Sequence, residues 1–120
     1  MTTPPALDHI ALSVPNLDEH VARLTTTFGM VAELHFAGGM AVLADPGSGL
    51  KFELSASDDS EVHFRHFGFR ADDVDRAHAS LVEAGMETNE EPQRQDFAHM
   101  YQSRLRQPGG LEVQLVKYDE

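Results

Sequence analysis

The chain switches between two hydrophobic periods, first a strand period and then a helix period. In residues 7–14 (LDHIALSV) apolar and polar positions alternate, which predicts a β-strand. Residues 17–28 then carry apolar side chains at helical spacing, and Gly29 predicts the end of that helix. Asn16 has the side chain of a helix N-cap, and Glu19 three residues later completes the pattern of a capping box. This segment therefore predicts a strand followed by a helix.

A second segment, FRHFGFRADDVDRAHASLVEAGM, follows the same plan. His66 lies 57 residues after His9, and the predicted helix caps keep the same offset, so the two segments align without gaps over their starts. Asp72 or Asp73 is expected to cap the second helix, and Gly85 is expected to end it. The chain therefore contains an internal duplication.

Strand patterns return after each helix. They are VAELHFA, GMAVLAD and LKFELSA in the first half, and METNEEP, AHMYQSRLR and LEVQLVKY in the second. Turn residues, Asp-Pro-Gly at 45–47 and Pro-Gly-Gly at 108–110, precede the last strand of each half. We expect an α+β fold in which two tandem βαβββ modules, about residues 5–57 and 62–118, form a curved mixed sheet around a shared cleft. Residues 1–120 are then one domain, since neither half has enough core to be stable alone.

Composition excludes several classes of protein. The 120 residues include no cysteine, which excludes disulfides, thiolate metal sites and a thiol nucleophile. A formal net charge of −11 repels phosphate backbones, so we expect no nucleic-acid partner. No apolar run reaches the roughly 20 residues of a membrane helix, and the start MTTPPALDH lacks the pattern of a signal peptide. A cytoplasmic protein without a membrane partner is expected.

Four polar side chains fall on strand faces opposite the large apolar residues. By alternation, His9 and His66 point away from the neighbours expected to pack on the helices, and so do Glu53 and Gln114. Two imidazoles, one carboxylate and one amide suit Zn²⁺, Ni²⁺, Mn²⁺ or Fe²⁺. A lone histidine on a strand is usually structural, but equivalent placement in a duplicated unit favours a metal site. We interpret the other histidines as structural or surface residues: His20, His35, His63, His78 and His99.

The duplicated plan resembles the vicinal oxygen chelate superfamily of glyoxalase I, bleomycin-resistance proteins and extradiol dioxygenases. LDHIALSV, RHFGFRADD and the turn before each last strand carry this resemblance over nearly the whole chain. In metal-dependent members, the first and last strands of each module supply the ligands. The resemblance therefore implies His9, Glu53, His66 and Gln114 as ligands of a divalent cation. The chain departs from the family where Gln114 replaces a usual Glu, and Glu112, on the same strand face, is the alternative fourth ligand.

The resemblance also implies a class of activity. It is a metal-dependent isomerase, epimerase or lyase that acts on a small oxygenated substrate through an enediolate-type intermediate. Glu53 would be its catalytic base, because the Gln114 amide cannot take a proton. We expect a homodimer, because one copy of the fold leaves strand edges exposed.

Three alternative functions remain open. One is a metal-free protein that sequesters a cationic drug, as bleomycin-resistance proteins do, and the net charge of −11 suits such a ligand. Its stacking groove would draw on Phe36, Phe64, Phe97 and Tyr101. The second is a small non-haem iron dioxygenase, and the third is an interaction module without a small ligand. No cluster of Arg or Lys marks a site for a carboxylate of a glutathione substrate, and Arg104 and Arg106 are the candidates for such a site.

Overall fold

The computed structural model describes residues 4–36 and 39–119, and it confirms the α+β class and both βαβββ modules. The first module comprises β1 (Ala6–Val14), α1 (Leu17–Phe28), β2 (Val31–Phe36), β3 (Met40–Ala44) and β4 (Lys51–Ala56). The second comprises β5 (His63–Arg70), α2 (Val74–Glu83), β6 (Glu87–Gln95), a 3₁₀ helix (Asp96–Ala98), β7 (Met100–Arg106) and β8 (Glu112–Tyr118). The first three residues of the chain lie outside the described residues.

The chain divides into two compact units, which we call the α1 unit (residues 8–65) and the α2 unit (residues 1–7 and 66–120). The α1 unit has the strand order β2-β3-β4-β1, and the α2 unit has the order β5-β8-β7-β6. In the described residues, each unit is thus a mixed four-stranded sheet with one α-helix. The single domain and the shared cleft stay predictions.

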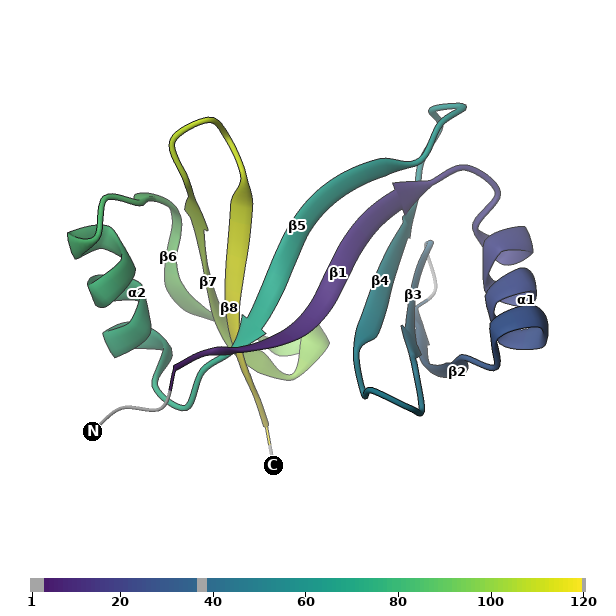
Figure 1. Cartoon of the computed structure of the whole chain (residues 1–120), viewed down its shortest axis with the longest axis horizontal. Helices are drawn as coiled ribbons and strands as arrows, with labels where there is room; N and C mark the ends of the chain where they lie inside the picture. The colour runs from purple at the N-terminus through teal and green to yellow at the C-terminus, as the bar shows by residue number, and fades with distance from the viewer. Residues whose placement is uncertain (1–3, 37–38, 120) are drawn as a thin grey trace. The chain divides into compact units, whose positions relative to one another are not determined.

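In the α1 unit, β1 pairs in parallel with β4, and the helix α1 packs on one face of the sheet (Figure 1). The register sets Ala11 opposite Glu53 and Leu12 opposite Leu54. The core on the helix side contains the following buried residues: Val14, Leu17, Met30, Ala41, Leu43 and Leu54. Because side chains alternate across a strand, His9 and Glu53 belong to the face away from α1, as the sequence predicts.

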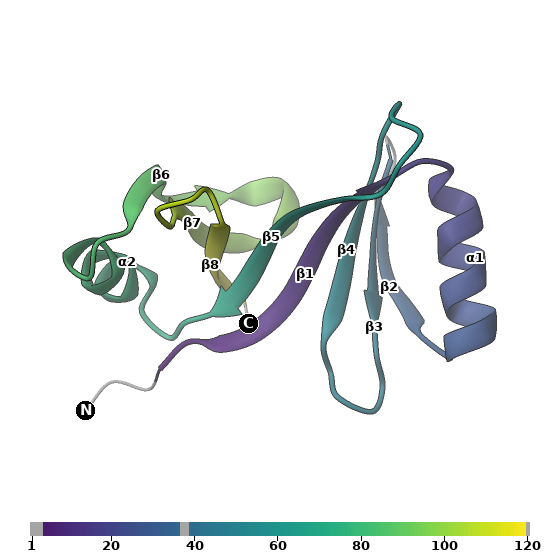
Figure 2. The same cartoon turned by 45° about the horizontal axis from the view of Figure 1, so that its top comes forward.

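The α2 unit repeats this arrangement, with β5 parallel to β8 and α2 packed on the sheet of its own unit (Figure 2). Its register sets Gly68 opposite Gln114 and Phe69 opposite Leu115. Leu115 lies in the core under α2, so Gln114 belongs to the opposite face. The two hydrophobic cores are separate, and each forms within one unit.

The start of α1 differs from the predicted capping box. Asn16 precedes the helix, but its backbone is left-handed (φ 52°, ψ 57°), and within the described residues its side chain makes no capping hydrogen bond. Instead its carbonyl oxygen accepts from the Glu19 amide at 3.0 Å. A side-chain cap requires an extended N-cap backbone, and Asn is one of the few residues that tolerates the left-handed region. The predicted boundary was correct and the predicted mechanism was wrong. Gly29 ends the helix in the left-handed region, as expected.

The start of α2 matches its prediction. Asp73 has an extended backbone, and its Oδ1 accepts from the Arg76 amide at 3.1 Å. The strand expected from residue 98 instead begins at Met100, because residues 96–98 form a 3₁₀ turn and His99 is left-handed at φ 51°.

Replacing Asp73 by Ala should destabilise the protein by about 1 kcal/mol, since the substitution leaves an orphan amide at the helix start. Thermal unfolding followed by circular dichroism measures this loss. Asp72→Ala is the matched control, because it removes the neighbouring exposed carboxylate and leaves the cap. Equal melting temperatures for the two variants would contradict the assigned cap.

Candidate metal centre

His9 is held in one orientation by the carboxylate that precedes it in the sequence. Its Nδ1 lies 2.8 Å from Asp8 Oδ2, and the side chains are 2% and 4% exposed, respectively. A carboxylate only accepts hydrogen bonds, so Nδ1 carries the proton and Nε2 keeps its lone pair in the neutral ring. This is how metal-binding histidines are usually oriented. Strand alternation does not predict this contact between Asp8 and His9, because adjacent strand residues are expected to face opposite ways.

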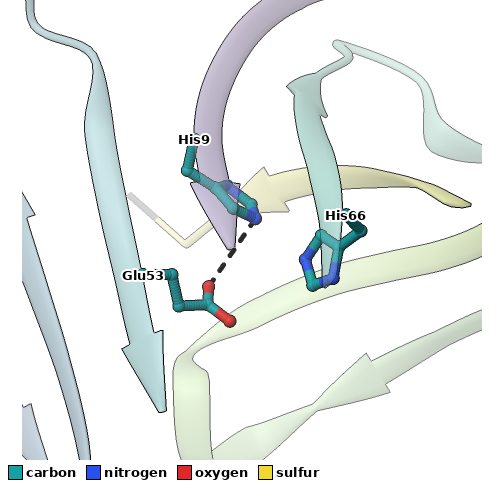
Figure 3. Close-up of side chains that lie close together, drawn as sticks. All are labelled: His9, Glu53 and His66. Atoms are coloured by element: carbon teal, nitrogen blue, oxygen red, sulfur yellow. Dashed lines mark ion pairs between the residues drawn. The ribbon is translucent and has the colours of Figure 1, made fainter. Parts of the chain in front are cut away.

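Glu53 lies next to the lone-pair nitrogen of His9. Figure 3 marks this contact with a dashed line: Glu53 Oε2 is 3.6 Å from His9 Nε2, and the Glu53 side chain is 19% exposed. This separation is too long for a hydrogen bond. It is close to the roughly 3.4 Å that separates two ligand atoms on a tetrahedral cation with bonds of about 2.1 Å. The α1 unit therefore brings two ligand types together at a spacing that fits a shared divalent cation.

The α2 unit contributes two more buried polar side chains from neighbouring strands. His66, labelled in Figure 3, lies on β5 and is 1% exposed, and Gln114 lies on β8 and is also 1% exposed. Gln114 pairs with Gly68, two residues after His66. The buried face of this sheet thus presents an imidazole and an amide.

The strand register favours Gln114 over Glu112 as the equivalent of Glu53. In the α1 unit the partner of Glu53 is Ala11, which lies two residues after His9. Gln114 has the same relation to His66 in the α2 unit. Glu112 lies two residues earlier on β8, and its counterpart in the α1 unit is Lys51.

Glu112 is also engaged elsewhere. It accepts a hydrogen bond from Asn89 Nδ2, and its other oxygen lies 3.9 Å from Arg104 Nη1. Arg104, one of the two candidates for binding a carboxylate of the substrate, therefore already faces a carboxylate of its own unit. The other candidate, Arg106, is exposed at the end of β7.

Four of the five remaining histidines have structural or surface positions. His78 is buried between two hydroxyls, with Nδ1 2.8 Å from Ser103 Oγ and Nε2 2.9 Å from Thr88 Oγ1. His63 is half-exposed and pairs with Asp59 at 2.7 Å. His20 is half-buried and His99 is exposed. The side chain of His35 lies outside the described part of the structure.

The four aromatic residues considered for a stacking groove do not share one environment. The Tyr101 hydroxyl donates to Asp75 Oδ1 at 2.7 Å, which raises the pKa of Tyr101, and its ring packs on the core of the α2 unit. Phe64 and Phe97 are exposed, and the Phe36 side chain is outside the described residues.

A pocket of about 410 Å³ lies on the helix side of the α1 unit, between α1 and β4. Its lining includes Leu24, Phe28 and Phe52 but none of the candidate ligands. No helix in the described residues is long and apolar enough to cross a membrane.

Comparison with known proteins identifies the family. The model of the Glyoxalase/Bleomycin resistance protein/Dioxygenase superfamily matches residues 6–115, and the chain belongs to this superfamily. The resemblance seen in the sequence is thereby confirmed. No curated protein matches the chain.

Solved structures share the fold at low identity. A methylmalonyl-CoA epimerase from Mycobacterium tuberculosis is 24% identical with a TM-score of 0.78, and the match covers 96% of this chain and 89% of that one. A Streptomyces coelicolor methylmalonyl-CoA epimerase in complex with 2-nitronate-propionyl-CoA is 20% identical with a TM-score of 0.78, covering 98% and 100%. A hypothetical protein from Bacillus halodurans is 14% identical with a TM-score of 0.71, covering 98% and 97%. These matches show a common fold.

The contact with Asp8 predicts which nitrogen of His9 carries the proton. In the neutral ring, His9 should be the Nδ1–H tautomer, and Asp8→Ala should shift the population towards Nε2–H. Long-range ¹H–¹⁵N correlation at alkaline pH distinguishes the two forms. Asp59→Ala is the control, since it should change the signals of His63 and leave those of His9 unchanged. A His9 tautomer indifferent to Asp8→Ala would show that the carboxylate does not orient the ring.

Proposed function

We propose that the chain is a divalent-metal-dependent isomerase, epimerase or lyase that acts on a small oxygenated substrate. One observation carries this proposal. A buried imidazole is oriented by Asp8, and its lone-pair nitrogen lies 3.6 Å from the carboxylate of Glu53. Neither group contributes to the hydrophobic core of the unit. A chain that places such groups on a sheet face, away from its helix, is suited to bind a cation and hold a proton.

The proposed ligands come from both units: His9 and Glu53 from one, and His66 and Gln114 from the other. His9, Glu53 and His66 each offer one atom of the kind that holds a transition metal. The matching strand register of Glu53 and Gln114 supports the assignment of the fourth ligand. Zn²⁺, Ni²⁺, Mn²⁺ and Fe²⁺ all accept imidazole and oxygen ligands, and a cation that takes five or six ligands would keep room for substrate beside these four.

Glu53 is the proposed base. A bound divalent cation supplies a Lewis acid for the negative charge that develops on a carbonyl oxygen of the substrate. Glu53 takes the proton from the adjacent carbon, and the electron pair of that C–H bond moves into the new enediolate. Return of the proton to carbon completes an isomerisation or epimerisation. Gln114 is neutral and takes no proton, so it binds without competing for this role.

The net negative charge of the chain limits the class of substrate that we propose. The epimerase structures of this fold are named for a coenzyme A ester, and several of them contain a coenzyme A ligand. Coenzyme A carries several phosphate charges, whereas this chain has 20 acidic and 9 basic residues. Repulsion between the phosphates and the acidic chain disfavours a substrate that carries a coenzyme A group. We therefore propose a smaller carbon acid with an oxygen next to the reacting carbon.

Metal content tests the proposed site directly. Protein purified without a chelator or affinity tag should contain about one equivalent of a transition metal by plasma mass spectrometry. The double variant His9→Ala/His66→Ala should lose it. The double variant His20→Ala/His63→Ala removes the same number of imidazoles and should retain it. Absence of metal from the wild type, even after reloading, would reject the metal-dependent activity and favour the drug-binding alternative.

The role of Glu53 has its own test. Glu53→Gln should keep the fold, since the side chain lies outside the hydrophobic core, and should slow proton transfer by at least about 10²-fold. Hydrogen–deuterium exchange at carbon, followed by NMR, measures this step on a short-chain methylmalonyl thioester and on a hemithioacetal. Glu33→Gln, an exposed carboxylate on β2, is the control. Unchanged exchange in Glu53→Gln would assign the base to another residue.

A further inference from the structure

We propose that Gln102 and Glu90 are positioning residues that fix which end of the Gln114 amide faces the metal. This inference rests on the proposed function, because it gives the Gln114 oxygen a role as ligand. All three residues lie in the α2 unit, on the adjacent strands β6, β7 and β8.

The three side chains form one directed chain of hydrogen bonds. Gln114 Nε2 donates to Gln102 Oε1 at 3.1 Å, and Gln102 Nε2 donates to Glu90 Oε1. Gln102 is 0% exposed and Gln114 is 1% exposed, while Glu90 is half-buried. Water therefore has little access to compete for the two amides, and their mutual hydrogen bond is strengthened by the low local dielectric.

The carboxylate at the outer end sets the direction of the whole chain. An ionised Glu90 can only accept, so Gln102 must turn its NH₂ group towards it. The carbonyl oxygen of Gln102 is then directed at Gln114, so Gln114 must donate a hydrogen bond from its own NH₂ group. As a result, the carbonyl oxygen of Gln114 lies at the end of its amide that is turned away from Gln102. This matters because an amide binds a cation through its oxygen and never through its NH₂ group.

The duplicated module provides an internal comparison. The strand register that makes Gln114 equivalent to Glu53 also makes Gln102 equivalent to Met40, since Gln102 pairs two residues beyond Gln114 and Met40 pairs two residues beyond Glu53. The two oxygens of a carboxylate are alike, so Glu53 needs no neighbour to choose between them. The two ends of an amide differ, and at these equivalent positions the amide has the polar Gln102 where the carboxylate has the apolar Met40.

Four variants separate orientation from simple loss of a contact. Glu90→Gln places an amide that can turn either way at the outer end, and Gln102→Leu removes the connection. Both should weaken binding of Co²⁺ about 10- to 100-fold by isothermal titration calorimetry. The double variant Glu90→Gln/Gln102→Glu restores a carboxylate acceptor beside Gln114 and should return the affinity to within about 3-fold of wild type. Glu91→Gln, an exposed carboxylate on the same strand, is the matched control.

A second measurement reads the hydrogen bonds without metal. In the metal-free protein, the side-chain NH₂ protons of Gln114 should exchange slowly with water by NMR, and several-fold faster in Glu90→Gln but not in Glu91→Gln. Equal exchange in both variants, or Co²⁺ affinity that the double variant does not restore, would overturn the inference. If the wild type binds no Co²⁺ while Glu90→Gln still accelerates exchange, the proposed metal function fails and the role of Gln102 as a positioning residue fails with it.

Discussion

Parallel pairing between the first and last strands of each module determines where the candidate ligands lie. In the α1 unit, a helix and two strands separate β1 from β4 in sequence, yet the two strands are neighbours and bring Glu53 close to His9. The pairing of β5 with β8 repeats this arrangement for His66 and Gln114. Because a helix occupies one face of each sheet, polar groups can collect only on the other face. The site is thus a product of topology, and no short motif in the sequence contains it.

Much of this could be predicted from alternation and repetition alone. The strand period assigns His9 and Glu53 to the face away from α1, and the offset of 57 residues identifies His66 as the counterpart of His9. These are properties of single strands, and a sequence displays them directly. The cap at Asp73 was equally accessible, because its hydrogen bond spans only three residues.

Contacts that depend on the pairing of neighbouring strands could not be predicted from alternation and repetition. Gln102 contacts Gln114 only through the register of β7 with β8, and a sequence does not state that register. Asp8 was missed for the opposite reason, since a rule about alternating faces argued against a contact with His9 that forms all the same. At Asn16 the backbone took a left-handed conformation, which residue preference allows but does not require.

The directed hydrogen bonds from Gln114 to Glu90 also constrain how the protein can evolve. Glutamine and glutamate codons differ by a single base, so a point mutation at position 114 could introduce the carboxylate usual in the family. A glutamate there would present an acceptor to the Gln102 oxygen, and a turned Gln102 would then present its oxygen to Glu90. Either state leaves two acceptors in contact. A substitution at position 90 or 102 would therefore have to precede Gln114→Glu. The effect of a substitution at position 114 thus depends on the residues at positions 90 and 102.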